Sequence, residues 1–255
     1  VFNALNTQLI TELIHNIKWT TDLSVSKNSS LVDSEDSVYL RVLVLIGEGK
    51  HFCAGADINM MRDAGARSVE ENREDSERLD RLFYGLWSHP CFTVGCIQGV
   101  ALGGGAGLVS CLDYVIAEPR TRIALSEAKL GILPAVIGPY VYRKIGSSNF
   151  RRLSMMASKI DSEEAKSIGL INAIAESSDE FSNSLEKIIS DVLSTGPMAV
   201  AEAKKLTLTF DRWDGSDDEL RQWTLDKTSQ MRGSEEGQEG LSSFLERRKP
   251  NWSSK

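Results

Sequence analysis

The chain has 255 residues, of which 41% are hydrophobic and 25% are charged. This composition is typical of soluble globular proteins, and the length is sufficient for one large core with or without an added element. A net charge of −7 argues against a nucleic-acid-binding surface, which is normally basic. The sequence therefore predicts no nucleic-acid partner. It also predicts no membrane-spanning helix, because no apolar run reaches about 18 residues.

Cysteine and histidine usage predicts neither a disulfide framework nor a metal site. The four cysteines form no CxxC pair and lack the Cys/His spacing of zinc sites. In a chain of this length we expect buried, reduced thiols of an intracellular protein. The three histidines are scattered and form neither an HxxxH nor an HExxH pattern. The residues concerned are Cys53, Cys91, Cys96, Cys111, His15, His51 and His89.

Hydrophobic periodicity predicts alternating helices and strands over the first two thirds of the chain. In chain order we expect a helix over residues 6–19, a polar surface loop over 20–37, a buried strand within 38–49, a surface helix over 67–87, a second buried strand within 91–102, a helix over 107–113, and short strands over 114–119 and 122–127.

The last part of the chain is predicted to be helical. The first of these helices begins near Asp161, which with Glu164 resembles an N-terminal cap, and stops at Gly169. A later helix has Pro197 at its first helical position. The expected helices lie within residues 161–172, 195–210, 218–231 and 239–252.

Two stretches share one plan, in which a buried strand leads through a tight glycine-containing turn into a helix. They are VLVLIGEGKHFCAGADI, residues 42–58, and FTVGCIQGVALGGGAGLVS, residues 92–110. Small residues let a ligand approach the backbone, and free N–H groups at a helix start point toward whatever binds there. Two such turns directed at one point would form an oxyanion hole, whose donors each contribute about 2.7–4 kcal/mol. Close helix–strand packing is the alternative explanation for the glycines.

Nucleotide-binding loops fit these glycines poorly. Gly103 and Gly105 have the first spacing of a GxGxxG loop, but Leu108 occupies the third glycine position. A GxxxxGK[ST] phosphate loop is also absent from the sequence.

Several motifs in order resemble the enoyl-CoA hydratase/isomerase (crotonase) family. They are FCAGAD, GVALGGGAGLVSCLDYVIA, LSEAKLGILPA and FLERRKPNW, and together they span most of the chain. The resemblance implies a spiral of ββα turns with two roughly perpendicular sheets over residues 1–195, which carries the acyl-CoA site. It implies a helical oligomerisation region over residues 196–255 and a homotrimer or a dimer of trimers. It also implies acyl-CoA substrates, with coenzyme A as part of the substrate and no metal or redox cofactor.

The resemblance also assigns roles to individual positions. Ala54 and Gly104 match the oxyanion-hole N–H donors, which would polarise a thioester carbonyl. The stretch Ala56, Asp57 and Ile58 matches the family segment whose backbone lies against the adenine of coenzyme A, although Asp57 could equally cap a local turn. Two further matches are Phe244 and Lys249, on a helix that reaches a neighbouring subunit's coenzyme A; trimer packing and a solvated charge are the alternatives.

One of two family carboxylates is missing. Many hydratases of the family place one Glu three positions beyond the middle glycine and a second 20 residues later. Here Gly107 takes the first position and Glu127 the second. Glu127 follows an apolar strand, so we expect partial desolvation, a raised pKa and an acid/base role. A helix cap or an ion pair with Lys129 is the alternative.

The single carboxylate leaves the reaction open between two classes. One base is sufficient to move a double bond, as in a Δ3,Δ2-enoyl-CoA isomerase, whereas hydration is easier with two. The motifs around Gly107 and Glu127, however, look like the methylglutaconyl-CoA hydratase branch, which acts in leucine breakdown. We therefore expect hydration by Glu127 alone, helped by a substrate carboxylate in the space that Gly107 leaves. A non-catalytic scaffold or RNA-associated protein is the alternative outside enzymes.

The compartment follows only in part from the sequence. The opening VFNALNTQLI already approaches a helix, so we expect that native N-terminal residues and any targeting peptide are missing. The expected location is intracellular, in the mitochondrial matrix if the source is eukaryotic and in the cytoplasm if it is bacterial.

Overall fold

The computed structural model describes residues 2–32, 34–35 and 37–254, so residues 33 and 36 of the predicted surface loop lie outside it. The chain forms two compact units. The first contains Val1–Trp19, Leu43–His89 and Thr93–Glu186, and the second contains Thr20–Val42, Pro90–Phe92 and Lys187–Lys255. The division therefore differs from the single boundary predicted after residue 195, because the second unit also includes segments from the N-terminal half.

The first unit carries two sheets. The larger has the strand order β1-β2-β4-β7, and both β2–β4 and β4–β7 are parallel. The smaller has the order β3-β5-β6, in which β3 and β5 are parallel and β6 is antiparallel. The strands are β1 (Val42–Ile46), β2 (Phe92–Ile97), β3 (Val100–Leu102), β4 (Tyr114–Ala117), β5 (Arg122–Ala124), β6 (Ile160–Asp161) and β7 (Ala173–Ile174).

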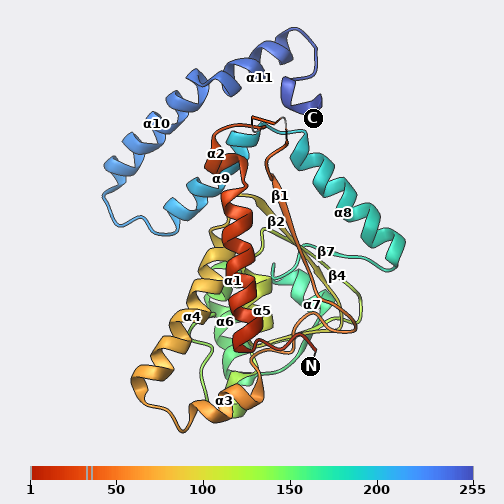
Figure 1. The fold of residues 1–255 in the computed structure, drawn as a ribbon, viewed down its shortest axis with the longest axis vertical. Helices are drawn as coiled ribbons and strands as arrows, with labels where there is room; N and C mark the ends of the chain where they lie inside the picture. Colours follow the sequence, from red (N-terminus) through yellow and green to blue (C-terminus); the bar gives the residue numbers. More distant parts are fainter. Residues whose placement is uncertain (1, 33, 36, 255) are drawn as a thin grey trace. The chain divides into compact units, whose positions relative to one another are not determined.

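The first unit also contains helices, and those that lie between parallel strands provide the crossover connections that such strands require. They are α1 (Thr7–Asp22), α3 (Ile58–Ala64), α4 (Val69–Trp87), α5 (Gly104–Cys111), α6 (Gly138–Met156) and α7 (Ser162–Ser167), with one 3₁₀ turn, η1 (Glu127–Leu130). The glycine-rich α5 packs against both α4 and α6 (Figure 1). Seven of its eight residues are buried, because small side chains let neighbouring helices approach closely.

Helix boundaries in this unit follow the capping chemistry of the sequence. Asp161 accepts a hydrogen bond from the Glu164 N–H at 2.9 Å, and Gly169 has a φ of +79° beyond the end of α7. The cap and stop predicted at these positions are therefore confirmed. The four cysteines are buried and none forms a disulfide, as expected from their spacing.

The second unit is mainly helical. Its elements are α2 (Val25–Asn28), α9 (Pro197–Phe210), α10 (Asp217–Gly233), α11 (Glu235–Leu245) and the 3₁₀ turn η2 (Asn251–Ser254), together with the end of α8 (Ser178–Leu193). Helices α10 and α11 follow one another in nearly the same direction (Figure 1). Helices α9, α10 and α11 are those predicted from the sequence, whereas α8 was not expected and α2 lies in the predicted surface loop.

Buried Arg41 organises the start of this helical region. Its guanidinium donates hydrogen bonds to the carbonyl oxygens of Val192, Leu193 and Thr195, at 3.0, 2.9 and 2.6 Å. These carbonyls lie at or just beyond the C-terminal end of α8, where carbonyl oxygens lack the N–H donor of a following helical turn and the dipole favours a cation. Among the helices that the structure describes, none is long and apolar enough to cross a membrane.

Candidate active site

The two glycine-containing turns meet in the first unit. The Leu102 N–H donates to the Cys53 carbonyl oxygen, and the Cys53 N–H donates to the Val100 carbonyl oxygen, both at 3.0 Å. A Cβ on Gly105 would lie 2.6 Å from the same Cys53 oxygen, so only glycine allows this approach. The turn after β1 is therefore held directly against the turn before α5.

In the first turn, the N–H group that remains free is not the one that the sequence predicted. The Ala54 N–H donates to the Phe2 carbonyl oxygen at 3.1 Å, so it is not available to a ligand. The Leu5 N–H donates to the Gly55 carbonyl oxygen, and the Asp57 N–H donates to the Leu5 carbonyl oxygen. The Ala56 N–H, in contrast, has no acceptor in the described part of the chain. Ala56 is half-buried and lines a cavity, so the candidate donor is Ala56 rather than Ala54.

In the second turn, Gly104 occupies the predicted position. It is the first residue of α5, where an N–H has no partner within the helix. The preceding Gly103 caps the helix with a φ of +50°, a conformation that favours glycine, and its N–H donates to the Ala124 carbonyl oxygen at 2.8 Å. Gly104 lines the same cavity as Ala56, and its N–H is available to a ligand there.

Glu127 lies beside this turn. An ideal Cβ on Gly103 would be 3.1 Å from Glu127 Oε1 and 3.5 Å from Ser126 Oγ, so the carboxyl group is held close to the bare backbone of Gly103. Glu127 Oε2 is buried and has no hydrogen-bond partner among the described residues. Burial raises the pKa of the Glu127 carboxyl above its ordinary value, and a backbone hydrogen bond opposes this shift in part. A desolvated, unpaired carboxyl group is suited to proton transfer.

A cavity of about 390 Å³ joins these groups. Its remaining lining is largely apolar and comes from α3, α4 and the segment between η1 and α6. The other carboxylate in the lining is Asp75, which forms ion pairs with Arg67 and, at 3.2 Å, with Arg78. No Lys or Arg lines the cavity within the described ranges. Glu127 is therefore the unpaired acid/base group of this lining.

Gly107 does not provide the space that the sequence suggested. A Cβ there would overlap with Ile137 Cγ2 and would lie 2.9 Å from Ile137 Cβ and 3.0 Å from Phe83 Cε1. Gly107 is buried within α5 and does not line the cavity. The expected room for a substrate carboxylate at Gly107 is thus filled by apolar side chains, and this expectation is corrected.

The residues predicted to contact coenzyme A lie in different surroundings. The Asp57 side chain accepts hydrogen bonds from the Asn59 and Met60 N–H groups at 2.9 and 3.2 Å and caps α3, as the alternative reading anticipated. Ile58 lines the cavity and is 64% exposed. Phe244 and Lys249 are exposed and belong to the second unit.

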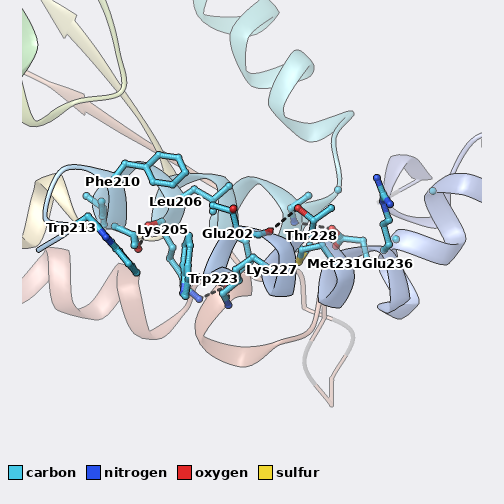
Figure 2. A pocket seen from close by; sticks show the side chains of 18 of the residues that line it. Glu202, Lys205, Leu206, Phe210, Trp213, Trp223, Lys227, Thr228, Met231 and Glu236 are labelled. Atoms are coloured by element: carbon cyan, nitrogen blue, oxygen red, sulfur yellow. Dashed lines mark hydrogen bonds and ion pairs between the residues drawn. The ribbon is translucent and has the colours of Figure 1, made fainter. Parts of the chain in front are cut away.

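The second unit has its own, larger cavity of about 1080 Å³. Figure 2 shows Phe210, Trp213 and Trp223 at one end of it, with Met231 and Glu236 toward the other. Phe210 packs edge-on against Trp223 with ring centroids 6.3 Å apart. Sequence reasoning predicted the helices around this cavity but not the cavity itself.

Comparisons with known proteins identify the family of the chain. The family model described as Enoyl-CoA hydratase/isomerase matches residues 1–255. A crotonyl-CoA hydratase from Syntrophomonas wolfei is 30% identical over 222 residues, which cover 86% of this chain and 83% of that protein. The crystal structure of an enoyl-CoA hydratase from Shewanella pealeana has a TM-score of 0.87 and 33% identity, covering 98% of this chain and 88% of that one. The structure of Pseudomonas aeruginosa AtuE also has a TM-score of 0.87, with 31% identity over 98% of this chain and 91% of that one.

These likenesses confirm the predicted crotonase-type α/β fold. The family match extends over both units, and so includes the two glycine turns and Glu127. The chain therefore belongs to the enoyl-CoA hydratase/isomerase (crotonase) family.

Proposed function

We propose that this chain adds water across the double bond of a 2-enoyl-CoA thioester. The observation that carries the proposal is the Glu127 carboxyl group, whose buried Oε2 lacks a hydrogen-bond partner within the described residues and which lies against Gly103, next to the free N–H of Gly104. A proton-transfer group and a backbone donor then face the same cavity.

In the proposed reaction, the thioester oxygen accepts hydrogen bonds from the Ala56 and Gly104 N–H groups. Glu127 removes a proton from water, the water oxygen bonds to Cβ, and the π electrons move onto the thioester oxygen as an enolate. The enolate then re-forms the carbonyl as Cα takes the proton from Glu127. Each N–H donor contributes about 2.7–4 kcal/mol in the transition state, and the acid/base group contributes about 10²–10⁴-fold in rate.

A Δ3,Δ2-enoyl-CoA isomerase is the second candidate, because Glu127 is the cavity's single unpaired carboxyl group among the described residues. One base that removes a proton at one carbon and returns it at another would complete that reaction without water. Incubation in ¹⁸O-labelled water separates the two, since hydration adds solvent oxygen to the product and isomerisation does not.

The acyl group is proposed to be uncharged. The methylglutaconyl-CoA hydratase role in leucine breakdown would require a substrate carboxylate in the cavity. One observation weighs against that substrate: the cavity lining has no Lys or Arg within the described ranges to bind the carboxylate. We therefore place crotonyl-CoA and similar thioesters ahead of 3-methylglutaconyl-CoA.

The test is turnover of a small panel by the wild type and by Glu127→Gln. We expect the wild type to hydrate crotonyl-CoA faster than 3-methylglutaconyl-CoA, and the variant to lose activity on both. Faster turnover of the carboxylated thioester would restore the leucine-breakdown role. Equal turnover by the wild type and Glu127→Gln would contradict the proposed role of Glu127, and a wild type that turns over neither thioester would favour a non-catalytic scaffold.

We also propose that the second unit mediates self-association. Its cavity is lined by aromatic and aliphatic side chains, and further apolar residues are exposed on the same helices. Leu225, Leu241, Phe244 and Leu245 are between 53% and 81% exposed. Several large apolar side chains exposed on neighbouring helices are typical of an interface between subunits.

A further inference from the structure

The residues that line the active-site cavity range from exposed to fully buried. Ile58, Leu130 and Leu133 are 64%, 54% and 80% exposed, so they lie at the mouth. Phe83 and Ile137 line the same cavity but are 1% and 4% exposed. Together with Leu5, which is 1% exposed, these two side chains form its inner wall.

The inner wall lies close to the proposed reacting carbonyl. The Phe83 ring faces two positions of α5, since its Cζ is 3.8 Å from an ideal Cβ on Gly104 and its Cε1 is 3.0 Å from one on Gly107. Gly104 and Gly107 are three residues apart, which corresponds to about 4.5 Å along the helix axis. An acyl chain whose carbonyl is held at the Gly104 N–H would thus meet the wall within a few carbon atoms.

Ile137 has a specific place in this wall. Its Cγ2 and Cβ fill the space directly beside Gly107, which has no side chain to oppose them. Ile137 precedes α6 as its N-cap residue and belongs to the buried core, so packing fixes its position. A buried, tightly packed side chain yields little to a longer ligand.

We propose that Ile137, seated against Gly107 and Phe83, closes the acyl end of the cavity and limits the substrate to short acyl groups. The inference rests on the proposed binding of an acyl-CoA thioester. Shortening Ile137 extends the cavity toward Gly107 and admits longer chains. A side chain at Gly107 pushes Ile137 into the cavity and has the opposite effect.

The test is the affinity of saturated thioesters, which bind without reacting. Butyryl-CoA and octanoyl-CoA are titrated calorimetrically into the wild type and Ile137→Ala. We expect the variant to improve octanoyl-CoA binding relative to butyryl-CoA by about tenfold or more, because each methylene accommodated is worth roughly that factor. The matched control is Ile145→Ala, since Ile145 is also buried on α6 and does not line the cavity.

Two further variants keep the test decisive. Ile137→Val removes one methyl group and should shift the ratio in the same direction by less, even if Ile137→Ala does not fold. Gly107→Ala should shift it toward butyryl-CoA. A ratio that stays within about twofold of the wild type in all three variants, or that shifts equally in Ile145→Ala, would overturn the inference.

Turnover decides the proposed function separately. A wild type that binds both thioesters with the expected dependence on Ile137 but does not hydrate crotonyl-CoA would support the pocket limit and contradict the hydratase. Hydration of crotonyl-CoA, with a ratio of octanoyl-CoA to butyryl-CoA affinity that is unchanged in Ile137→Ala, would support the hydratase and contradict the pocket limit.

Discussion

Glu127 is the residue on which the chemistry depends. Burial raises the pKa of its carboxyl group, and its Oε2 has no protein partner in the described part of the chain. Such an arrangement costs stability when the group is ionised, because burial disfavours the charged form. The buried position of Glu127 therefore lowers the free energy of unfolding when the group is ionised, and it also suits the group to proton transfer. Perturbed pKa values of this kind are common at functional sites.

Replacement of Glu127 by Gln should separate activity from stability. We expect turnover to fall by about 10²–10⁴-fold. A carboxyl group with a raised folded-state pKa supports folding at low pH and loses this support as pH rises through that pKa. Glu127→Gln should consequently melt at or above the wild-type temperature near neutral pH, and the gain should shrink as the pH is lowered. Thermal unfolding of both proteins across a pH series measures this, and a variant less stable at neutral pH would contradict it.

The pH dependence of catalysis should report the same group. Because Glu127 acts first as a base, kcat/KM should rise with pH through its free-enzyme pKa. The raised pKa places this acidic limb above the ordinary value for Glu, which is about 4.3. Steady-state rates across the pH range test this, and a limb at or below the ordinary value would argue against Glu127 as the base.

The identity of the two N–H donors can be checked directly. A crystal structure with an unreactive thioester analogue should place the thioester oxygen within about 3.1 Å of the Ala56 and Gly104 nitrogens. The Ala54 nitrogen should keep its bond to the Phe2 carbonyl oxygen. An oxygen bound at Ala54 instead would restore the assignment made from the motif.

At the scale of elements, α5 both packs in the core and positions a backbone donor of the site. Its glycines bring the helix start against the first turn and the helix body against α4 and α6. The free Gly104 N–H at this start then faces the cavity. The glycine run thus has both of the roles considered from the sequence, since close packing is what positions the donor.

Gly105→Ala should show the packing requirement. Its Cβ would meet the Cys53 carbonyl oxygen at 2.6 Å, so the two turns would have to separate. We expect a loss of about 1–3 kcal/mol in the free energy of unfolding. Gly233→Ala in α10 is the matched control, because nothing lies within 4 Å of its Cβ and alanine favours the helix by up to about 1 kcal/mol. Denaturant unfolding compares them, and equal effects would show that close approach at Gly105 is not required.

At the scale of the whole molecule, the apolar surface of the second unit predicts an oligomer. We expect the wild type to elute as more than one subunit in chromatography with light scattering at micromolar concentration. Leu225→Lys should shift it toward the monomer, since Leu225 is 60% exposed and a charge there disfavours burial.

The control for this experiment is Gln230→Lys, which adds the same charge at another exposed position of α10. It should leave the subunit number unchanged. A monomeric wild type, or equal dissociation by both variants, would contradict the proposed interface.

The sequence by itself determined the α/β pattern, the two strand–turn–helix motifs and the place of Glu127. These features depend on local chemistry, because hydrophobic period, caps such as Asp161 and glycine turns act over a few neighbouring residues. The family resemblance rests on the same local motifs, and the family match over residues 1–255 confirmed that resemblance.

Only the tertiary structure decided which N–H is free and what lies beside Gly107. The Ala54 N–H is occupied by a carbonyl from Phe2, and the space at Gly107 is filled by Ile137 and Phe83. In both cases the deciding group comes from a distant part of the chain. A motif specifies which residues are present, whereas hydrogen-bond pairing and filled volume depend on what the fold brings against them.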